Sequence, residues 1–236
     1  MVADINNIVF PPDIKLADLV ESDFNLLNVL SRLGISPGFG DDTVSDVCDR
    51  YGIDQSTFLL ICCIYAYEDY VPSAEQMVCT DPLMIVDYLH RSHSFYLEKE
   101  FVSMERDIKA MVEHCDSIQK KMVAKFFSDY KAQVENHFAY EEDVVFPYVR
   151  ALVGGESREG YTIEQFEENH SNIDETLCDL KNIVMKYLPD TCDTVLRNEV
   201  LYRIFRLERD LSRHTALEEK VLIPVVNRME EDEERL

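Results

Sequence analysis

An eleven-residue motif occurs twice in this sequence and constrains its fold more than any other feature. HFAYEEDVVFP begins at residue 137 and HTALEEKVLIP begins at residue 214, an offset of 77 residues. Each copy has a His, a Glu four positions later, a second Glu directly after it, and a Pro ten positions after the His. Residues four positions apart lie on the same face of an α-helix. Each copy therefore predicts a helix that directs one imidazole and one carboxylate toward the same side.

Apolar residues extend both copies with the alternating four- and three-residue spacing of a helix-bundle core. One seam consists of Val123, Phe127, Tyr130, Val134, His137, Glu141, Val144 and Tyr148. Its counterpart, offset by 77 throughout, consists of Val200, Ile204, Leu207, Leu211, His214, Glu218, Val221 and Val225. Two further seams carry His residues without the Glu: Leu83, Val86, His90, His93, Leu97, Met104 and Met111, and Ile163, Phe166, His170, Ile173, Leu177, Leu180, Val184 and Tyr187. The four seams predict four core-facing helices.

Capping signals give the ends of these helices. Asp81-Pro82 and the pair Asp116 and Gln119 are typical of helix starts, and Gly154-Gly155 is typical of a helix end. We predict helices at about residues 82–113, 117–152, 163–187 and 194–230. Short connections make sequential helices antiparallel. We therefore expect an all-α protein whose main part is an up-down-up-down four-helix bundle, built as a duplicated helical hairpin.

The first 80 residues differ in composition from the rest of the chain, because they contain most of the Pro and Gly. The segments 16–33, 42–50 and 54–68 are predicted to form short helices. We expect a small helical domain at residues 1–75, a linker near residues 70–81, and the bundle at residues 80–236.

Charge and cysteine usage exclude several classes of partner. The formal net charge of −23 argues against nucleic acid as a partner, because nucleic-acid binding requires clustered Lys and Arg, and against binding to an anionic membrane surface.

The first residues lack the build of a signal peptide, and the longest apolar run, FLLICCIYAY at 58–67, is too short to cross a bilayer. Seven Cys residues without a CxxC motif indicate reduced thiols rather than a disulfide framework. We expect a cytoplasmic protein.

The seam histidines predict a dinuclear metal site. Counted from the helix ends, each antiparallel pair of histidines lies within roughly one helical turn of the same height. Four imidazoles and two carboxylates in an apolar core are costly unless cations satisfy them. The predicted ligands are His90, His137, Glu141, His170, His214 and Glu218. Imidazole and carboxylate ligands with open positions suit iron, with manganese or zinc as alternatives.

Several neighbouring residues leave alternatives open. His93 lies on the same seam as His90, so either could be the ligand, but the repeat aligns His90 with His170 and favours it. We expect His93 to line the surroundings of the site. Glu142 and Glu219 follow the ligand glutamates and point about 100° away on a regular helix, which favours surface positions. A lone His on a seam is more often a core residue than a ligand, and only the repetition favours the metal site.

The arrangement of these residues resembles that of the hemerythrin-like di-iron proteins, and most closely the iron–sulfur cluster repair branch. The order single His, His-x-x-x-Glu, single His, His-x-x-x-Glu matches this branch at His90, at His137 with Glu141, at His170, and at His214 with Glu218. Residues 18–53 are similar to the short N-terminal domain of the repair proteins. That domain normally carries two adjacent cysteines, where this chain has Ser36-Pro37-Gly38-Phe39-Gly40, and Cys48 matches a further family cysteine.

The resemblance implies a site with two iron ions joined by an oxo or hydroxo bridge, which handles nitric oxide, oxygen or peroxide. It further implies a role in the response to nitrosative or oxidative stress, either in repair of damaged iron–sulfur proteins or in handling nitric oxide. Because the cysteine pair is missing, a module that senses oxygen, nitric oxide or redox state and signals to a partner is an alternative. A structural metal bundle without chemistry is a third. Whether the chain is an enzyme, and whether it forms a homodimer, stays open.

Overall fold

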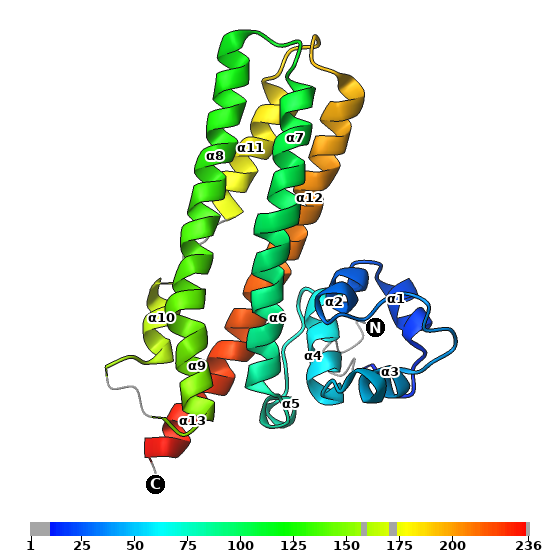
Figure 1. Cartoon of the computed structure of the whole chain (residues 1–236), viewed down its shortest axis with the longest axis vertical. Coiled ribbons are helices and arrows are strands. Elements are labelled where there is room, and N and C mark those ends of the chain that lie inside the picture. Colours follow the sequence, from blue (N-terminus) through cyan, green and yellow to red (C-terminus); the bar gives the residue numbers. More distant parts are fainter. Residues whose placement is uncertain (1–9, 157–159, 170–173, 235–236) are drawn as a thin grey trace, which may run out of the picture. The chain divides into compact units, whose positions relative to one another are not determined.

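The computed structural model describes residues 10–156, 160–169 and 174–234. Its regular elements are all helical, and within these residues the only β-type pairing is one isolated bridge between Lys15 and Thr43. The predicted all-α fold is confirmed (Figure 1). By contacts the chain divides into two compact units. The first unit comprises residues 1–92, 145–169 and 213–236, and the second comprises residues 93–144 and 170–212. The predicted domain boundary near residues 75–80 stays a prediction.

The long helices of the chain closely match the predicted boundaries, but three of them contain a π-helical turn. The first consists of α6 (Pro82–Phe95), η2 (Tyr96–Glu100) and α7 (Phe101–Met111). The second consists of α8 (Ser117–Tyr140), η3 (Glu141–Val145) and α9 (Phe146–Val153). In place of the predicted third helix, the structure describes α10 (Ile163–Asn169) and α11 (Asp174–Lys186). The fourth consists of α12 (Thr194–Leu217), η4 (Glu218–Leu222) and α13 (Ile223–Glu234).

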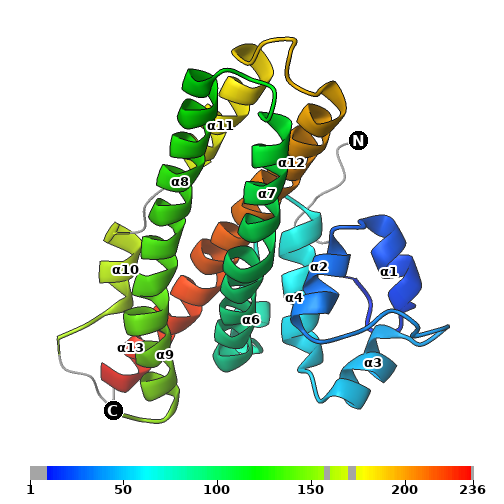
Figure 2. The same ribbon diagram turned by 45° about the horizontal axis from the view of Figure 1, so that its top comes forward.

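The second unit is a four-helix bundle. In both views α7, α8, α11 and α12 lie side by side (Figures 1 and 2), and all four contribute to one apolar core. The core includes seam residues that the heptads predicted: Met104 and Met111, Val123, Phe127, Tyr130 and Val134, Leu177, Leu180 and Val184, and Val200, Ile204, Leu207 and Leu211. Burial of this continuous apolar seam from each helix provides the main stabilisation of the bundle.

The first unit contains the N-terminal helices α1 (Leu16–Ser22), α2 (Leu26–Arg32), α3 (Val44–Tyr51), α4 (Gln55–Ala66) and α5 (Ala74–Val78). The predicted helix at 16–33 is interrupted, and α5 lies in the predicted linker. The buried Arg32 guanidinium donates hydrogen bonds to the hydroxyls of Tyr65 (3.0 Å) and Tyr88 (3.2 Å) and lies over both rings. Arg91 of α6 donates to the Arg32 carbonyl at 3.1 Å. These hydrogen bonds connect α2 to α4 and to α6.

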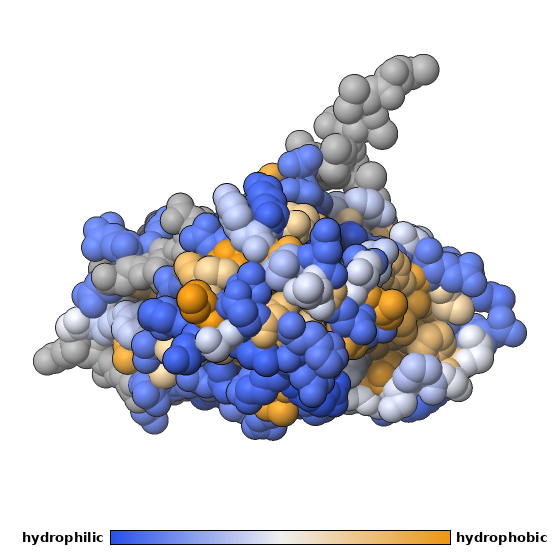
Figure 3. Space-filling model, turned by 90° about the horizontal axis from the view of Figure 1, so that it is seen from above, coloured by the Kyte–Doolittle hydropathy of each residue, from blue (hydrophilic) through white to orange (hydrophobic). Residues whose placement is uncertain are grey.

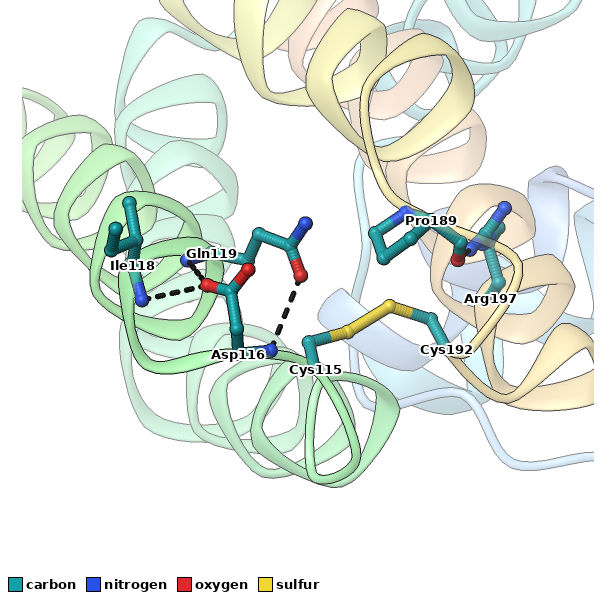
Figure 4. Close-up of a disulfide and its surroundings, with 7 residues drawn as sticks. All are labelled: Cys115, Asp116, Ile118, Gln119, Pro189, Cys192 and Arg197. Atoms are coloured by element: carbon teal, nitrogen blue, oxygen red, sulfur yellow. Dashed lines mark hydrogen bonds between the residues drawn. A yellow bond between two sulfur atoms is a disulfide. The ribbon is translucent and has the colours of Figure 1, made fainter.

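A disulfide between Cys115 and Cys192 corrects the prediction that the thiols are reduced (Figure 4). Each Cys directly precedes the N-cap residue of a long helix. The Asp116 carboxylate accepts hydrogen bonds from the amides of Ile118 and Gln119, and Asp193 accepts from those of Val195 and Leu196. The two cysteines are 77 residues apart, which is the offset of the repeat. The disulfide therefore joins equivalent turns of the two hairpins.

One face of the molecule is seen in a view coloured by hydropathy (Figure 3). Figure 3 shows a face that is largely hydrophilic, with hydrophobic residues scattered over it and gathered toward the right of the view. Of the helices that the structure describes, none combines the length and the apolar character needed to cross a membrane.

Candidate metal site

Two pairs of buried side chains, His93 with Glu141 in the second unit and His214 with Glu218 in the first, have donor atoms that could hold a metal ion. Glu141 and Glu218 are both 0% exposed. Charged carboxylates are rarely buried to this extent unless they are paired or bound to a metal. Three of the four, all except His93, are predicted ligands.

Glu141 lies between two imidazoles in the second unit. Its Oε2 atom is 2.9 Å from Nε2 of His93, and its Oε1 atom is 2.8 Å from Nε2 of His137. Among the described residues, neither carboxylate oxygen accepts a hydrogen bond of acceptable geometry. A fully buried carboxylate thus has each oxygen close to a different imidazole nitrogen, in contacts that are not hydrogen bonds.

The donor atoms around Glu141 could hold a metal cation. Ligands bound at about 2.1 Å on one tetrahedral metal ion lie about 3.4 Å apart. The distances from Glu141 to His93 and His137, 2.9 and 2.8 Å, are shorter than this. One oxygen with His93 can serve one cation, and the other oxygen with His137 can serve a second. The donor set, nitrogen with carboxylate oxygen, suits iron, manganese or zinc.

The second motif repeats this ligand pair in the first unit. Nε2 of His214 is 2.9 Å from Oε1 of Glu218, and the two side chains are 1% and 0% exposed. The predicted pairing of His and Glu within each copy of the motif is therefore present in both units.

Both ligand glutamates are the first residue of a π turn, Glu141 in η3 and Glu218 in η4. A π turn contains one more residue than an α turn and is frequent at functional sites. Pro147 and Pro224 each occupy the second position of the helix that follows the π turn, and that helix continues for at least six further residues. Pro lacks an amide hydrogen, and a position directly after a π turn tolerates that loss because the hydrogen-bond pattern already changes there.

The structure includes His93 in the buried group and leaves His90 exposed. The predicted seam placed both His90 and His93 on one regular helix, and only the alignment of the repeat favoured His90. The π turn η2, Tyr96–Glu100, lies within that helix and adds one residue, which moves the core positions back by one. Accordingly Tyr96 and Leu89 are both 0% exposed, and His93 lies one turn from each of them. The preference for His90 over His93 is thus not supported by the placement of the two side chains.

Glu142 is a residue of this site that the sequence prediction missed. Its Oε1 atom is 2.7 Å from Nδ1 of His93, although a surface position was expected. The expectation assumed 100° per residue, whereas the wider π turn rotates less per residue and lets Glu141 and Glu142 reach the two nitrogens of one imidazole. Glu219, in contrast, is exposed as predicted. The signal in the sequence was the second Glu of the motif.

The remaining predicted residues are placed as follows. His170 lies outside the described residues, and its role as a ligand stays a prediction. Tyr130 is buried in the bundle core. The Tyr148 hydroxyl donates to the carboxylate of Glu230, which also accepts from the amide of Ile163 at 2.8 Å. Tyr148 thus ties together three segments of the first unit.

The N-terminal thiols are not part of this group. Burial raises the pKa of Cys48 to about 12 and raises the pKa of Cys62 and Cys63 as well. A thiol with a raised pKa stays protonated near neutral pH and is a poor nucleophile and metal ligand. The three residues therefore act as small apolar side chains of the N-terminal helices.

Comparison with known proteins supports the interpretation of this group as a cation site. The family model described as the hemerythrin HHE cation binding domain matches residues 97–226, more than half of the chain. The match contains His137, Glu141, His214 and Glu218 and begins after His93. No curated protein matches the chain.

Proposed function

Because the chain belongs to the hemerythrin HHE cation-binding family, we propose that it is a non-haem di-iron protein that acts on nitric oxide, oxygen or peroxide in a cytoplasmic stress response. Repair of damaged iron–sulfur proteins is the role favoured by the similarity of residues 18–53 to the N-terminal domain of repair proteins.

The observation that carries the proposal is the environment of Glu141. Its buried carboxylate has one imidazole nitrogen at 2.9 Å and another at 2.8 Å, on different oxygens. Two cations would satisfy this arrangement, because each would join one carboxylate oxygen to one imidazole lone pair, and neither oxygen has a hydrogen-bond partner among the described residues. Two iron ions bound here would offer a small molecule an open coordination position and an electron. The chain itself supplies a water-poor core, since His93, His214 and both glutamates are at most 3% exposed.

The first experiment is metal loading of the full-length protein. We expect two iron ions per chain after anaerobic incubation with ferrous iron, and about one or none in the variant Glu141→Gln. The loaded protein should then restore activity to an iron–sulfur enzyme damaged by nitric oxide. Zinc as the only metal retained, or no recovery by the iron-loaded protein, would contradict the proposal.

A second candidate function, sensing, is favoured by contacts of the second motif with the linker. Lys220 of η4 donates to the carbonyls of Glu68 (2.9 Å) and Tyr70 (3.1 Å). Arg213, directly before His214, is 3.4 Å from the Glu68 carboxylate. The helix that carries His214 and Glu218 thus holds the segment that leads from the N-terminal helices to the bundle. A change in the position of these ligands would be passed to the linker.

Hydrogen exchange of residues 67–73 separates the two candidates. If the protein is a sensor, nitric oxide added to the iron-loaded protein should raise exchange in this segment, and Lys220→Met should raise it without nitric oxide. Lys109→Met, which removes an exposed Lys paired with Glu105, is the control and should leave the segment unchanged. Equal exchange with and without nitric oxide would leave repair as the better candidate.

A further inference from the structure

His93 is held by three side chains of one helical segment. Phe138 of α8 stacks on the imidazole, with ring centroids 3.9 Å apart and an angle of 13° between the planes. Glu141 faces Nε2 at 2.9 Å, and Glu142 faces Nδ1 at 2.7 Å. The ring, 3% exposed, is therefore fixed in its plane, and each of its nitrogens has one carboxylate.

The two carboxylates have different surroundings. The Glu142 side chain is 30% exposed, so water stabilises its charge, whereas Glu141 is 0% exposed. A neutral imidazole has one N–H and one lone pair. The N–H is best placed on Nδ1, where Glu142 accepts it with the geometry of a charge-assisted hydrogen bond. Nε2 then presents its lone pair on the side of Glu141.

We propose that Glu142 is a positioning residue, which holds His93 as the Nδ1–H tautomer and so presents Nε2 to the cation bound by Glu141. The inference rests on the proposed metal function, and it assigns a role to a residue outside the set of ligands. Carboxylates that accept the second N–H of a ligand imidazole fix its tautomer and orientation, and their loss typically weakens metal binding about 10- to 100-fold.

The repeat supplies a matched control. Glu219 occupies the position equivalent to Glu142 at an offset of 77, follows the ligand Glu218 in the same way, and is exposed. The same substitution at both positions removes the same charge from the second residue of a π turn. Only the substitution at Glu142 removes a carboxylate from His93.

The first test uses the metal-free protein with 15N-labelled histidine. The tautomer of each of the six His residues is assigned from two-bond 1H–15N correlations, with His93→Gln identifying the signal of His93. We expect Nδ1–H in the wild type and in Glu219→Leu, and a mixture of tautomers in Glu142→Leu. Glu142→Gln retains a carbonyl acceptor and should keep His93 in the Nδ1–H form. This variant also provides a measurement if Glu142→Leu does not fold. An unchanged tautomer in Glu142→Leu would overturn the inference.

The second test measures metal affinity of the same proteins by competition with a chelator. Iron should bind about 10- to 100-fold more weakly to Glu142→Leu, several-fold more weakly to Glu142→Gln, and equally well to Glu219→Leu and the wild type. Equal losses at both positions would reduce Glu142 to a surface charge and overturn the inference. If the wild type itself binds no iron, the proposed function fails, and the tautomer measurement still decides the role of Glu142.

Discussion

The two copies of the motif, residues 137–147 and 214–224, have the same backbone and different surroundings. In each copy the ligand glutamate begins a π turn, and the proline is the second residue of the helix that follows. In each copy a disulfide-bonded Cys lies 22 residues before the His, Cys115 before His137 and Cys192 before His214. The duplication thus extends from the turn of each hairpin to the ligands and beyond.

The copies differ at the positions that flank the ligands. The second copy has Arg213 and Lys220, which bind the linker at Glu68 and Tyr70. At the equivalent positions the first copy has Asn136 and Asp143, both exposed and neither of them basic. Glu142 of the first copy contacts His93, whereas its equivalent Glu219 is exposed. One hairpin is therefore specialised for holding a ligand imidazole, and the other for contact with the N-terminal region.

The largest effect on iron binding is expected from substitution of the ligand glutamate, which both copies of the motif contain. Glu141→Gln and Glu218→Gln should each weaken iron binding by more than about 100-fold, because loss of residues that only orient ligands already costs 10- to 100-fold. In the metal-free protein the same changes should raise the midpoint of thermal unfolding, since each removes a buried charge. Calorimetry with and without iron would show both effects. Equal affinity in both variants, or a lower midpoint for the metal-free variants, would contradict a bridging carboxylate.

His90 and His93 provide the next test, because the repeat favours His90 as the ligand, whereas the structure buries His93 beside Glu141. His93→Ala should lower the iron content of the purified protein from two ions per chain to about one. His90→Ala, which truncates an exposed side chain, should leave iron content and stability unchanged, within about 0.5 kcal/mol. Metal analysis of both variants after identical loading decides between the two residues. Loss of iron in the His90 variant alone would restore the alignment that the repeat favoured.

This disagreement shows what the sequence could and could not predict. Heptad spacing, N-caps such as Asp116 and the repeat were sufficient to place the helices, and the structure pairs His137 with Glu141 and His214 with Glu218. These predictions depend on local spacing within one turn. His93 lies three residues before a π turn that no residue preference announces. With the shift of one residue there, His90 is exposed and His93 stays buried. The contact between Glu142 and His93 depends on the same kind of turn.

The disulfide was missed for another reason. Pairing depends on the distance between two turns, which the sequence does not encode locally, although the offset of 77 between Cys115 and Cys192 was visible. This offset predicts a disulfide only if the turns of the two hairpins are already known to lie side by side. The odd number of cysteines concealed it, because the other five form no disulfide in the part of the chain that the structure describes.

Removal of this disulfide is expected to have the third-largest effect. The double variant Cys115→Ser/Cys192→Ser should lose up to about 4 kcal/mol of unfolding free energy, because the bond closes a loop of 77 residues. That loss corresponds to roughly 10 °C in the midpoint of thermal unfolding. Iron affinity should change little, so this variant separates stability from metal binding. Cys79→Ser, at an exposed free thiol, is the control. An unchanged midpoint in the double variant would show that the thiols are not paired in solution.

The smallest effect concerns Tyr148, whose equivalent in the second copy is Val225. Burial raises the pKa of the Tyr148 hydroxyl above its usual value, and the hydrogen bond to the Glu230 carboxylate raises it further. The folded protein therefore holds this proton more tightly than the unfolded chain, whose tyrosines titrate near pH 10. The contribution of Tyr148 to stability should be complete below about pH 10 and should decline as the pH rises further, toward the pKa of the folded state. Tyr148→Phe should be slightly less stable at pH 8, and its stability should fall less steeply above pH 10 than that of the wild type. Parallel pH profiles of urea unfolding for the two proteins would show that the hydroxyl is not held by Glu230, and would remove this difference between the two hairpins.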